Sequence, residues 1–220
     1  MSKMISIVIT SYNKELFIDR AIRSCLNQLL FSKQKEVIVV DDNSTDQTLV
    51  KIREFEDEVK IILNDMNYGV AYTSNVGLSE STGEYWIRVD ADDYLSMHAC
   101  EFMSAILIYN PDIDFVYTDH IRVDYLGNTI KRVYLSTDEK LYEHGAGIMF
   151  RKEKLIEIGG YSNVFRNCED YDLLIRLKKN GAKGYYLPIP LYKYYIHGNN
   201  ITLDDSREAY KQLVRQRNGL

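Results

Sequence analysis

Proline, cysteine and long apolar runs are scarce in this sequence, and each scarcity excludes a class of protein. Only 3 Pro and 12 Gly occur in 220 residues, which argues against long disordered linkers. The 3 Cys, at positions 25, 100 and 168, form no CxxC pair, so neither a disulfide framework nor a thiolate metal site is indicated. The apolar run within residues 1–10 is too short for a secretory signal or a membrane span. We therefore expect a cytoplasmic chain that forms one compact body.

Basic blocks and phosphate-binding loops are also lacking. The 27 Lys and Arg are outnumbered by 32 Asp and Glu, which gives a formal net charge of −5 and argues against a nucleic-acid partner. The turn after the first apolar run contains neither GxGxxG nor GxxxxGK[ST], nor a glycine-rich loop with Arg. The sequence thus supports neither a dinucleotide oxidoreductase, nor a P-loop phosphotransferase, nor a nucleotidyl transferase. A metal ion would have to carry much of any phosphate binding.

Apolar runs alternate with amphipathic windows over roughly the first 110 residues, which is typical of a mostly parallel sheet flanked by helices. We expect strands at residues 5–10, 36–40, 60–63 and 84–89. Helices are expected from residue 18, at 70–78 and through 99–106. Ser44 and Gln47 have the spacing of a capping box for a further helix. The core-facing helical positions are Ile18, Ala21, Ile22, Cys25, Leu26 and Leu29 in the first helix, and Ala99, Phe102, Met103 and Ile106 in the last. The predicted fold class is α/β, with a Rossmann-like sheet.

The second part of the chain is less regular. It predicts a hairpin of residues 115–123 and 130–134, a short helix at 152–158, and a helix that opens at residues 168–172. Gly145 and Gly147 indicate either a close approach of the backbone to a ligand or a tight bend. A last helix at residues 206–214 either covers the body or pairs with a second copy, so a homo-oligomer is left open. Tyr side chains gathered at residues 185–195 either pack between sheet and helix or stack on a sugar ring.

Three carboxylates, those of Asp90, Asp92 and Asp93, follow one apolar run within four residues. Carboxylates this close repel one another unless a cation compensates them, and their hard oxygens suit Mg²⁺, Mn²⁺ or Ca²⁺. The alternative is a solvated acidic turn. The earlier strands end in residues 10–13 and 41–44, and parallel strands bring such ends to one edge of the sheet. The sequence therefore predicts a polar ligand-binding edge.

A second acidic group, Glu169, Asp170 and Asp172, lies in the first turn of a predicted helix. These residues either complement the helix dipole or supply a general base that accepts a proton from a substrate hydroxyl. Cys168 beside them is expected to pack rather than to act as a nucleophile. His197 follows a strand and is either a third metal ligand, a donor to a diphosphate, or an exposed loop histidine.

Five segments together resemble family 2 glycosyltransferases, in their order along the chain and over about residues 4–200. They are Ser6-Ile7-Val8-Ile9-Thr10-Ser11-Tyr12-Asn13-Lys14, Val39-Val40-Asp41-Asp42-Asn43-Ser44-Thr45-Asp46, Asn67-Tyr68-Gly69-Val70 with Ser74-Asn75-Val76-Gly77-Leu78, Asp90-Ala91-Asp92-Asp93, and Glu169-Asp170-Tyr171-Asp172-Leu173. The resemblance implies a GT-A fold, a nucleotide-sugar donor, Mn²⁺ or Mg²⁺ as cofactor, and inversion at the anomeric carbon.

The resemblance also implies residue roles. Thr10 would lie near the nucleoside, and Asp42 would hydrogen-bond the base, usually uracil. Asp92 and Asp93 would contact the diphosphate and metal in a DxD-type motif supported by Asp90. The remaining implied positions are Tyr12, Asn13, Asp41 and Asn75 for donor binding, Asp170 with Glu169 for catalysis, and His197 for the metal. Ser74 stands where many members have Arg, which removes one expected positive contact.

From this resemblance we expect a metal-dependent transferase that moves a sugar from a nucleoside diphosphate, UDP first, to an acceptor hydroxyl in polysaccharide or glycan synthesis. Residues 1–110 would bind the donor, residues 111–203 would bind the acceptor and carry the base, and residues 204–220 would form a tail. A lipid-linked saccharide acceptor would bring the chain to the inner face of a membrane. The alternatives are a non-catalytic nucleotide- or carbohydrate-binding module of the same fold, and a hydrolase of nucleotide sugars. No motif in the sequence predicts which sugar is transferred, to which acceptor, or in which linkage.

Overall fold

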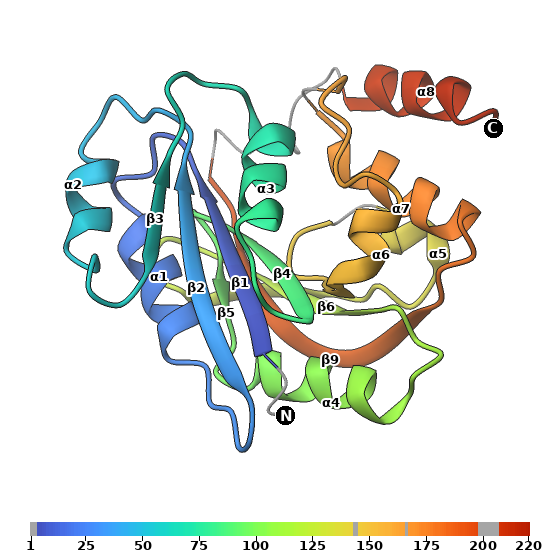
Figure 1. Cartoon of the computed structure of the whole chain (residues 1–220), viewed down its shortest axis with the longest axis horizontal. Coiled ribbons are helices and arrows are strands. Elements are labelled where there is room, and N and C mark those ends of the chain that lie inside the picture. The colour runs from blue at the N-terminus through green and yellow to red at the C-terminus, as the bar shows by residue number, and fades with distance from the viewer. Residues whose placement is uncertain (1–3, 143–144, 166, 198–206) are drawn as a thin grey trace.

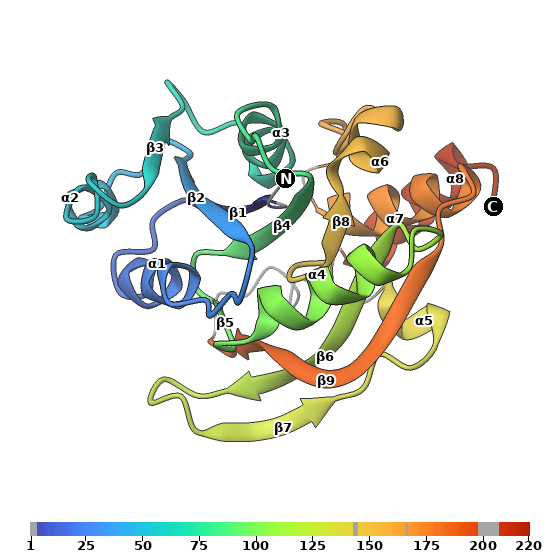
Figure 2. The same cartoon turned by 60° about the horizontal axis from the view of Figure 1, so that its bottom comes forward.

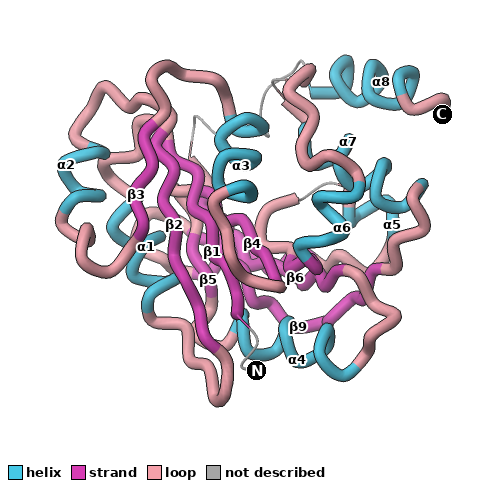
Figure 3. The backbone as a smooth tube through the Cα atoms, viewed as in Figure 1, coloured by secondary structure: helices cyan, strands magenta, loops and turns pink. Residues whose placement is uncertain are grey.

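The computed structural model describes residues 4–142, 145–165, 167–197 and 207–220 (Figure 1). Its described strands form one sheet in the order β3-β2-β1-β4-β8-β6-β9-β5, with β7 paired to β6. Helices lie on either side of this central layer, as Figure 3 shows. Among the described residues, no helix is both long and apolar enough to cross a membrane.

The first four strands are parallel, as predicted for the first half of the chain. They are β1 (Met4–Ser11), β2 (Gln34–Asp41), β3 (Lys60–Leu63) and β4 (Tyr85–Asp90). The register pairs Thr10 of β1 with Val40 of β2 and with Asp90 of β4. The carboxyl ends of the three strands therefore meet at one edge, which is where the polar segments of the sequence begin.

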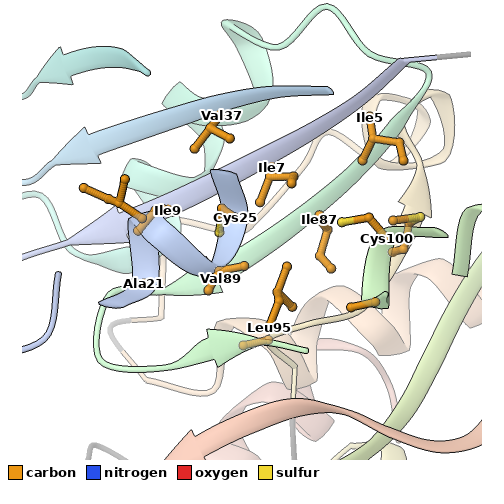
Figure 4. Packing of buried hydrophobic residues seen from close by; sticks show 14 of the residues in the cluster. Ile5, Ile7, Ile9, Ala21, Cys25, Val37, Ile87, Val89, Leu95 and Cys100 are labelled. Atoms are coloured by element: carbon orange, nitrogen blue, oxygen red, sulfur yellow. The ribbon is translucent and has the colours of Figure 1, made fainter. Parts of the chain in front are cut away.

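Residues of β1 alternate between two cores because successive side chains of a strand point to opposite faces. Ile5, Ile7 and Ile9 pack with residues of α1 (Ile18–Leu26) and α4 (Ala99–Tyr109), as Figure 4 shows. Figure 2 shows the two helices themselves. Val8 packs on the other face with α3 (Val70–Ser79). All four of these strand side chains are fully buried. The helix over β1 sits so close that a Cβ atom at Gly77 would lie 2.3 Å from a methyl carbon of Val8.

The second half adds strands of mixed direction. β8 (Met149–Arg151) runs antiparallel to both β4 and β6 (Phe115–Val123) and so joins the halves. The long β9 (Gly184–Tyr195) lies parallel to β6, with two irregularities in the register around Asp119. The remaining elements are β5 (Tyr94–Leu95), β7 (Thr129–Val133), α2 (Thr48–Arg53), α5 (Asp138–Leu141), α6 (Lys152–Glu157), α7 (Glu169–Lys179) and α8 (Arg207–Arg217).

Several local predictions are confirmed and others are wrong. Leu29 lies beyond the end of α1 and is 49% exposed, and Phe102 of α4 is 41% exposed, so neither side chain faces the core as the helical spacing predicted. The hairpin of β6 and β7, the short α6 and the helix that opens at Glu169 lie where the sequence predicts them. The capping box of Ser44 and Gln47 does not form, because the Ser44 hydroxyl donates to Asp41 Oδ1 at 2.6 Å and α2 begins only at Thr48. Residues 198–200 and Ser206, which also entered the predictions, lie outside the described residues.

The last helix covers the body of the protein. α8 lies beside α7 (Figure 1), where Val214 is fully buried. Arg215 donates to the Tyr171 hydroxyl at 2.8 Å, and Asn218 donates to Asp172 Oδ1 at 3.0 Å. α8 thereby fixes the first turn of α7 from behind. Asp172, whose second oxygen accepts from Arg176, is a structural residue.

Candidate active site

Asp93 anchors the loop that carries Asp90, Asp92 and Asp93, here called the acidic loop, to β9. It is 1% exposed; its Oδ1 accepts from the Tyr195 backbone at 2.9 Å, and its Oδ2 accepts from the Tyr192 hydroxyl at 2.8 Å. Burial, followed by the charges of Asp92 and Asp90, raises the pKa of Asp93 well above its ordinary value. Both oxygens of this carboxyl thus serve to hold the loop against β9. Its predicted role as a metal ligand stays a prediction.

Asp92 carries the carboxylate on which cationic groups converge. Its Oδ2 lies 2.6 Å from Lys14 Nζ and 3.0 Å from His197 Nε2, and its backbone oxygen accepts from Arg20 at 3.1 Å. Burial by itself would raise the pKa of Asp92, but the His197 hydrogen bond and the Lys14 charge outweigh it and lower the pKa. The structure therefore brings together Asp92 and His197, which are 105 positions apart in the chain.

Arg88 connects the acidic loop with the start of α7. Its guanidinium is 2% exposed and lies 3.2 Å from Asp90, 3.2 Å from Glu169 and 3.0 Å from Asp170. Burial acts to lower the pKa of Arg88, but the charges of Asp170 and Asp90 raise it well above its ordinary value. This residue was missed by the sequence analysis, because a single Arg inside an apolar strand carries no signal of its partners. One permanent positive charge is shared by three carboxylates from two parts of the chain.

Arg88 also lies beside Ser74, the residue that precedes Asn75 in α3. Ser74 is fully buried, and its hydroxyl lies 3.4 Å from an Arg88 nitrogen. The sequence analysis noted that Ser74 leaves out a positive charge common at this position. The structure places the guanidinium of Arg88 beside it, so a positive charge is present there and comes from β4 instead of α3.

Glu169 and Asp170 begin α7 but have different surroundings. The helix is preceded by Cys168 in the left-handed conformation at φ 64°, which turns the chain so that both carboxylates face Arg88. Burial, and after it the charge of Asp170, raises the pKa of Glu169 to about 8 against the opposing effect of Arg88. The side chain of Asp170 is 24% exposed, whereas that of Glu169 is 9% exposed. Of the two, Asp170 is the carboxylate that a substrate hydroxyl can reach.

Two glycines before β8 approach side chains of this region closely. A Cβ atom at Gly145 would lie 2.0 Å from the Cβ of Asp170, and Gly147, at φ 72°, approaches the ring of Tyr192 to a similar degree. The two glycines therefore allow the backbone to approach side chains of the protein itself.

Cys168 is buried next to Phe165 and Ile175, in agreement with its expected packing role.

The ends of β1 and β2 are tied to each other. Asn13, at φ 50°, accepts from the Thr45 backbone at 2.8 Å and donates its own N–H to Ser44 Oγ at 2.9 Å. Asp41 accepts from the backbone and the hydroxyl of Ser44, and burial raises the pKa of Asp41. Thr10 is 8% exposed, while Tyr12 is 43% exposed at the same edge. Tyr12 and Asn13 are thus the exposed residues among the predicted donor-binding positions at the ends of β1 and β2.

Two predicted donor contacts have partners within the chain. Asp42 accepts hydrogen bonds from Asn64 at 2.7 Å and from the backbone N–H groups of Tyr68 and Gly69 at 3.0 and 2.8 Å. Asn75 donates to the carbonyl of Tyr161 and accepts from the N–H of the same residue, both at 2.8 Å. Asp42 shapes the loop before α3, and Asn75 joins α3 to the segment after α6. Their contacts with a donor stay predictions.

The metal-ligating side chains at this edge suit a metal ion that binds together with a diphosphate. Among the described residues, no group of three or more His, Cys, Asp and Glu side chains is arranged to hold a metal ion. Asp92 and His197 do supply one carboxylate and one imidazole side by side. Mg²⁺ in particular is usually bound by one or two carboxylates together with substrate phosphates and water. The residues present therefore fit such an ion, with Asp92 and His197 as its protein ligands.

Solved structures of similar shape define the class of protein. TarS of S. aureus in complex with UDP-GlcNAc superposes with a TM-score of 0.82 at 21% identity, over 99% of this chain and 65% of that one. The mannosyltransferase PcManGT of Pyrobaculum calidifontis in complex with GDP-Man and Mn²⁺ gives 0.73 at 17% identity, over 99% and 62%. The protein has the GT-A fold, and the predicted fold class is confirmed.

The sequence comparison makes the assignment narrower. The model of the family described as Glycosyl transferase family 2 matches residues 6–167, and the chain belongs to this family. An uncharacterized glycosyltransferase of Haemophilus influenzae is 32% identical over 79% of this chain and 62% of its own length. WfgD of Escherichia coli, named as UDP-Glc:alpha-D-GlcNAc-diphosphoundecaprenol beta-1,3-glucosyltransferase, is 27% identical over 97% and 83%. The chain thus spans about three fifths of the length of the Haemophilus relative.

Proposed function

We propose that this protein transfers a sugar from a nucleoside diphosphate donor to an acceptor hydroxyl in the synthesis of a surface polysaccharide or glycan. One observation carries the proposal: Arg88 holds Asp90, at the end of a donor-side strand, and Asp170, at the start of α7, within 3.2 Å of one guanidinium. Residues 1–110 would bind the donor and residues 111–203 the acceptor. The two parts would meet at the site where the sugar is transferred from donor to acceptor.

In this reaction Asp170 is the general base. It accepts the proton of the acceptor hydroxyl while the hydroxyl oxygen attacks the anomeric carbon and the bond from that carbon to the diphosphate oxygen breaks. Attack opposite to the leaving group inverts the configuration at that carbon. Arg88 orients Asp170, and its charge stays in place because the guanidinium is not deprotonated in proteins. Glu169, with a pKa of about 8, holds its own proton at neutral pH and adds no second negative charge.

The leaving diphosphate needs positive charge, and the edge formed by Asp92, His197, Lys14 and Arg20 is where we place it. A divalent cation bound by Asp92 and His197 would neutralise the negative charge that develops on the diphosphate. Lys14 and Arg20 add two cations of the chain itself within 3.1 Å of Asp92. Thr10 and Tyr12 border the same edge and would contact the nucleoside.

The donor and acceptor are proposed by analogy with the relatives. UDP stands in the name of WfgD and in that of the TarS complex, which supports a UDP-sugar before GDP-mannose. The name of WfgD contains a diphosphoundecaprenol-linked sugar, which supports a lipid-linked saccharide acceptor reached from the cytoplasmic face of a membrane. No membrane anchor of this chain is required for that encounter.

Calorimetric titration tests the donor site first. Purified protein is titrated with UDP, GDP, ADP and CDP, each with Mn²⁺ and with EDTA. We expect binding of UDP that requires Mn²⁺, because a diphosphate without a counter-charge is poorly bound by an acidic edge. Analysis of the products from a UDP-sugar, with and without a saccharide acceptor, then separates a transferase from a hydrolase. Absence of nucleotide binding in all eight conditions would support a non-catalytic module of the same fold.

A further inference from the structure

Lys14 occupies the position at Asp92 where a metal ion is expected. Its Nζ lies 2.6 Å from Asp92 Oδ2, and the ion pair is largely buried, with 24% of the lysine side chain and 14% of the aspartate side chain exposed. The backbone of Lys14 is fixed as well, because its N–H donates to Thr48 Oγ1 at 2.7 Å. The ammonium group is therefore held at this oxygen by a turn that is itself anchored to α2.

An ammonium group and a divalent cation compete for one carboxylate oxygen. Oδ2 of Asp92 already has Lys14 Nζ at 2.6 Å and His197 Nε2 at 3.0 Å, which leaves little room for a metal ion at bonding distance from this oxygen. Two positive charges a few ångströms apart also repel by more than about 1 kcal/mol in a partly buried site. A metal ion that arrives alone must therefore move Lys14 away from Asp92.

We propose that Lys14 is a resident counter-cation of Asp92, which a divalent cation displaces only when a nucleoside diphosphate arrives with it. The diphosphate brings enough negative charge for the metal ion and for the released ammonium group, so Lys14 passes from the carboxylate to the phosphate. Metal binding and nucleotide binding are then positively coupled, and the coupling is reciprocal. This inference rests on the proposed function, since it takes Asp92 to be the metal ligand.

The test measures Mn²⁺ binding itself, from the loss of the free-ion signal in electron paramagnetic resonance, with and without UDP or GDP. We compare the unsubstituted protein with Lys14→Met, Lys14→Arg and Lys33→Met. Lys33 is a matched control because its ammonium group also pairs with a largely buried carboxylate, that of Glu101 at 2.7 Å, and not with Asp92. Thermal unfolding of each variant verifies that it is folded.

In the absence of nucleotide, Lys14→Met should bind Mn²⁺ about tenfold more tightly than the unsubstituted protein. Lys14→Arg should bind it as weakly as the unsubstituted protein, and Lys33→Met should change the affinity by less than about threefold. The gain in Mn²⁺ affinity that the nucleotide gives should be smaller in Lys14→Met than in the unsubstituted protein.

Two results would overturn the inference, and they differ in what else they affect. If nucleotide promotes Mn²⁺ binding to the unsubstituted protein but Lys14→Met binds Mn²⁺ alone no more tightly, Lys14 does not compete and the proposed function stands. If no variant binds Mn²⁺ even with UDP or GDP, the metal site of the proposed function fails together with the role of Lys14.

Discussion

Asp92 and Asp170 have different surroundings in the structure, and the proposed function gives them separate roles. Asp92 lies among Lys14, Arg20 and His197, whereas Asp170 faces Arg88 and is more exposed than its neighbour Glu169. We expect Asp170→Asn to bind UDP with Mn²⁺ within about twofold of the unsubstituted protein while transfer falls by about a hundredfold or more. Asp92→Asn should weaken the Mn²⁺-dependent binding itself. Calorimetry and a transfer assay on the same preparations check both, and an equal loss of binding in the two variants would contradict this division.

Glu169 predicts a dependence of stability on pH. Its pKa is about 8 in the folded protein and about 4.5 as an ordinary glutamate. Because the pKa is raised on folding, the proton stabilises the fold fully below pH 4.5, and this contribution is lost as the pH rises through 8. The unfolding free energy of the unsubstituted protein should fall between pH 5 and pH 9 by more than that of Glu169→Gln. The difference between the two falls should be on the order of a few kcal/mol. Urea unfolding at both values measures the difference, and an unchanged difference would show that Glu169 is ionised at neutral pH.

Arg88 should be costly to replace because its buried guanidinium compensates the charges of Asp90 and Asp170 and also contacts Glu169. Arg88→Met leaves them without a partner, and a loss of about 3–5 kcal/mol of unfolding free energy is expected. Arg88→Lys keeps the charge but not the planar fork that reaches several carboxylates at once, so it should recover only part of the loss. Denaturant unfolding of the two variants checks this order, and equal stability of Arg88→Met and Arg88→Lys would show that the positive charge without the planar fork contributes nothing.

The motif residues themselves could be predicted from the sequence, but many of their contacts could not. Asp42 and Asn75 were predicted to bind the donor, and in the structure their polar atoms bond to Asn64, Tyr68, Gly69 and Tyr161. Lys14 and Arg88 gave no signal as partners of Asp92 and Asp170. A motif fixes residue types at short spacing, whereas these contacts depend on side chains that only the folded chain brings together.

At the scale of elements, the approach of the segment before β8 to the start of α7 decides where Asp170 stands. A Cβ atom at Gly145 would overlap the Asp170 side chain, so Gly145→Ala should displace the base and lower transfer at least about tenfold, with UDP binding retained. Gly77→Ala is the matched control, since its Cβ would meet Val8 in the core under α3. That variant should lose about 1–3 kcal/mol of stability without a selective loss of transfer in the molecules that remain folded. A transfer rate for Gly145→Ala equal to that of the unsubstituted protein would contradict the close packing.

Elements of the first half were easier to predict than those of the second. β1, β2 and β4 are runs of buried residues between amphipathic helices, and periodicity detects both. In the second half β8 has only three residues, and β9 is long, partly exposed and irregular in its register beside β6. Pairing partners and strand direction depend on residues far apart in the chain, which hydrophobic periodicity does not report.

At the scale of the whole molecule, α8 supports the candidate base from outside the active site. Val214 is fully buried against α7, while its neighbour Leu213 is 52% exposed. Val214→Asp would bury an unpaired charge, release α8 and loosen Tyr171 and Asp172 in the first turn of α7. We expect a lower melting temperature and a fall in transfer larger than any fall in UDP binding, because the first four strands do not depend on α8. Leu213→Asp should have little effect on these quantities. Equal behaviour of the two variants in thermal unfolding and transfer would show that α8 is dispensable.

The hydrogen bonds of Asp93 also bear on how the protein is made. Asp93 bonds to Tyr192 and Tyr195, which lie 99 and 102 positions later in the chain. During synthesis on the ribosome, β1 to β4 can pair long before those tyrosines have left the exit tunnel. The acidic loop receives its final anchors only when β9 has emerged and joined the sheet. A nascent chain therefore completes the hydrogen bonds of this loop only after Tyr195 has been made.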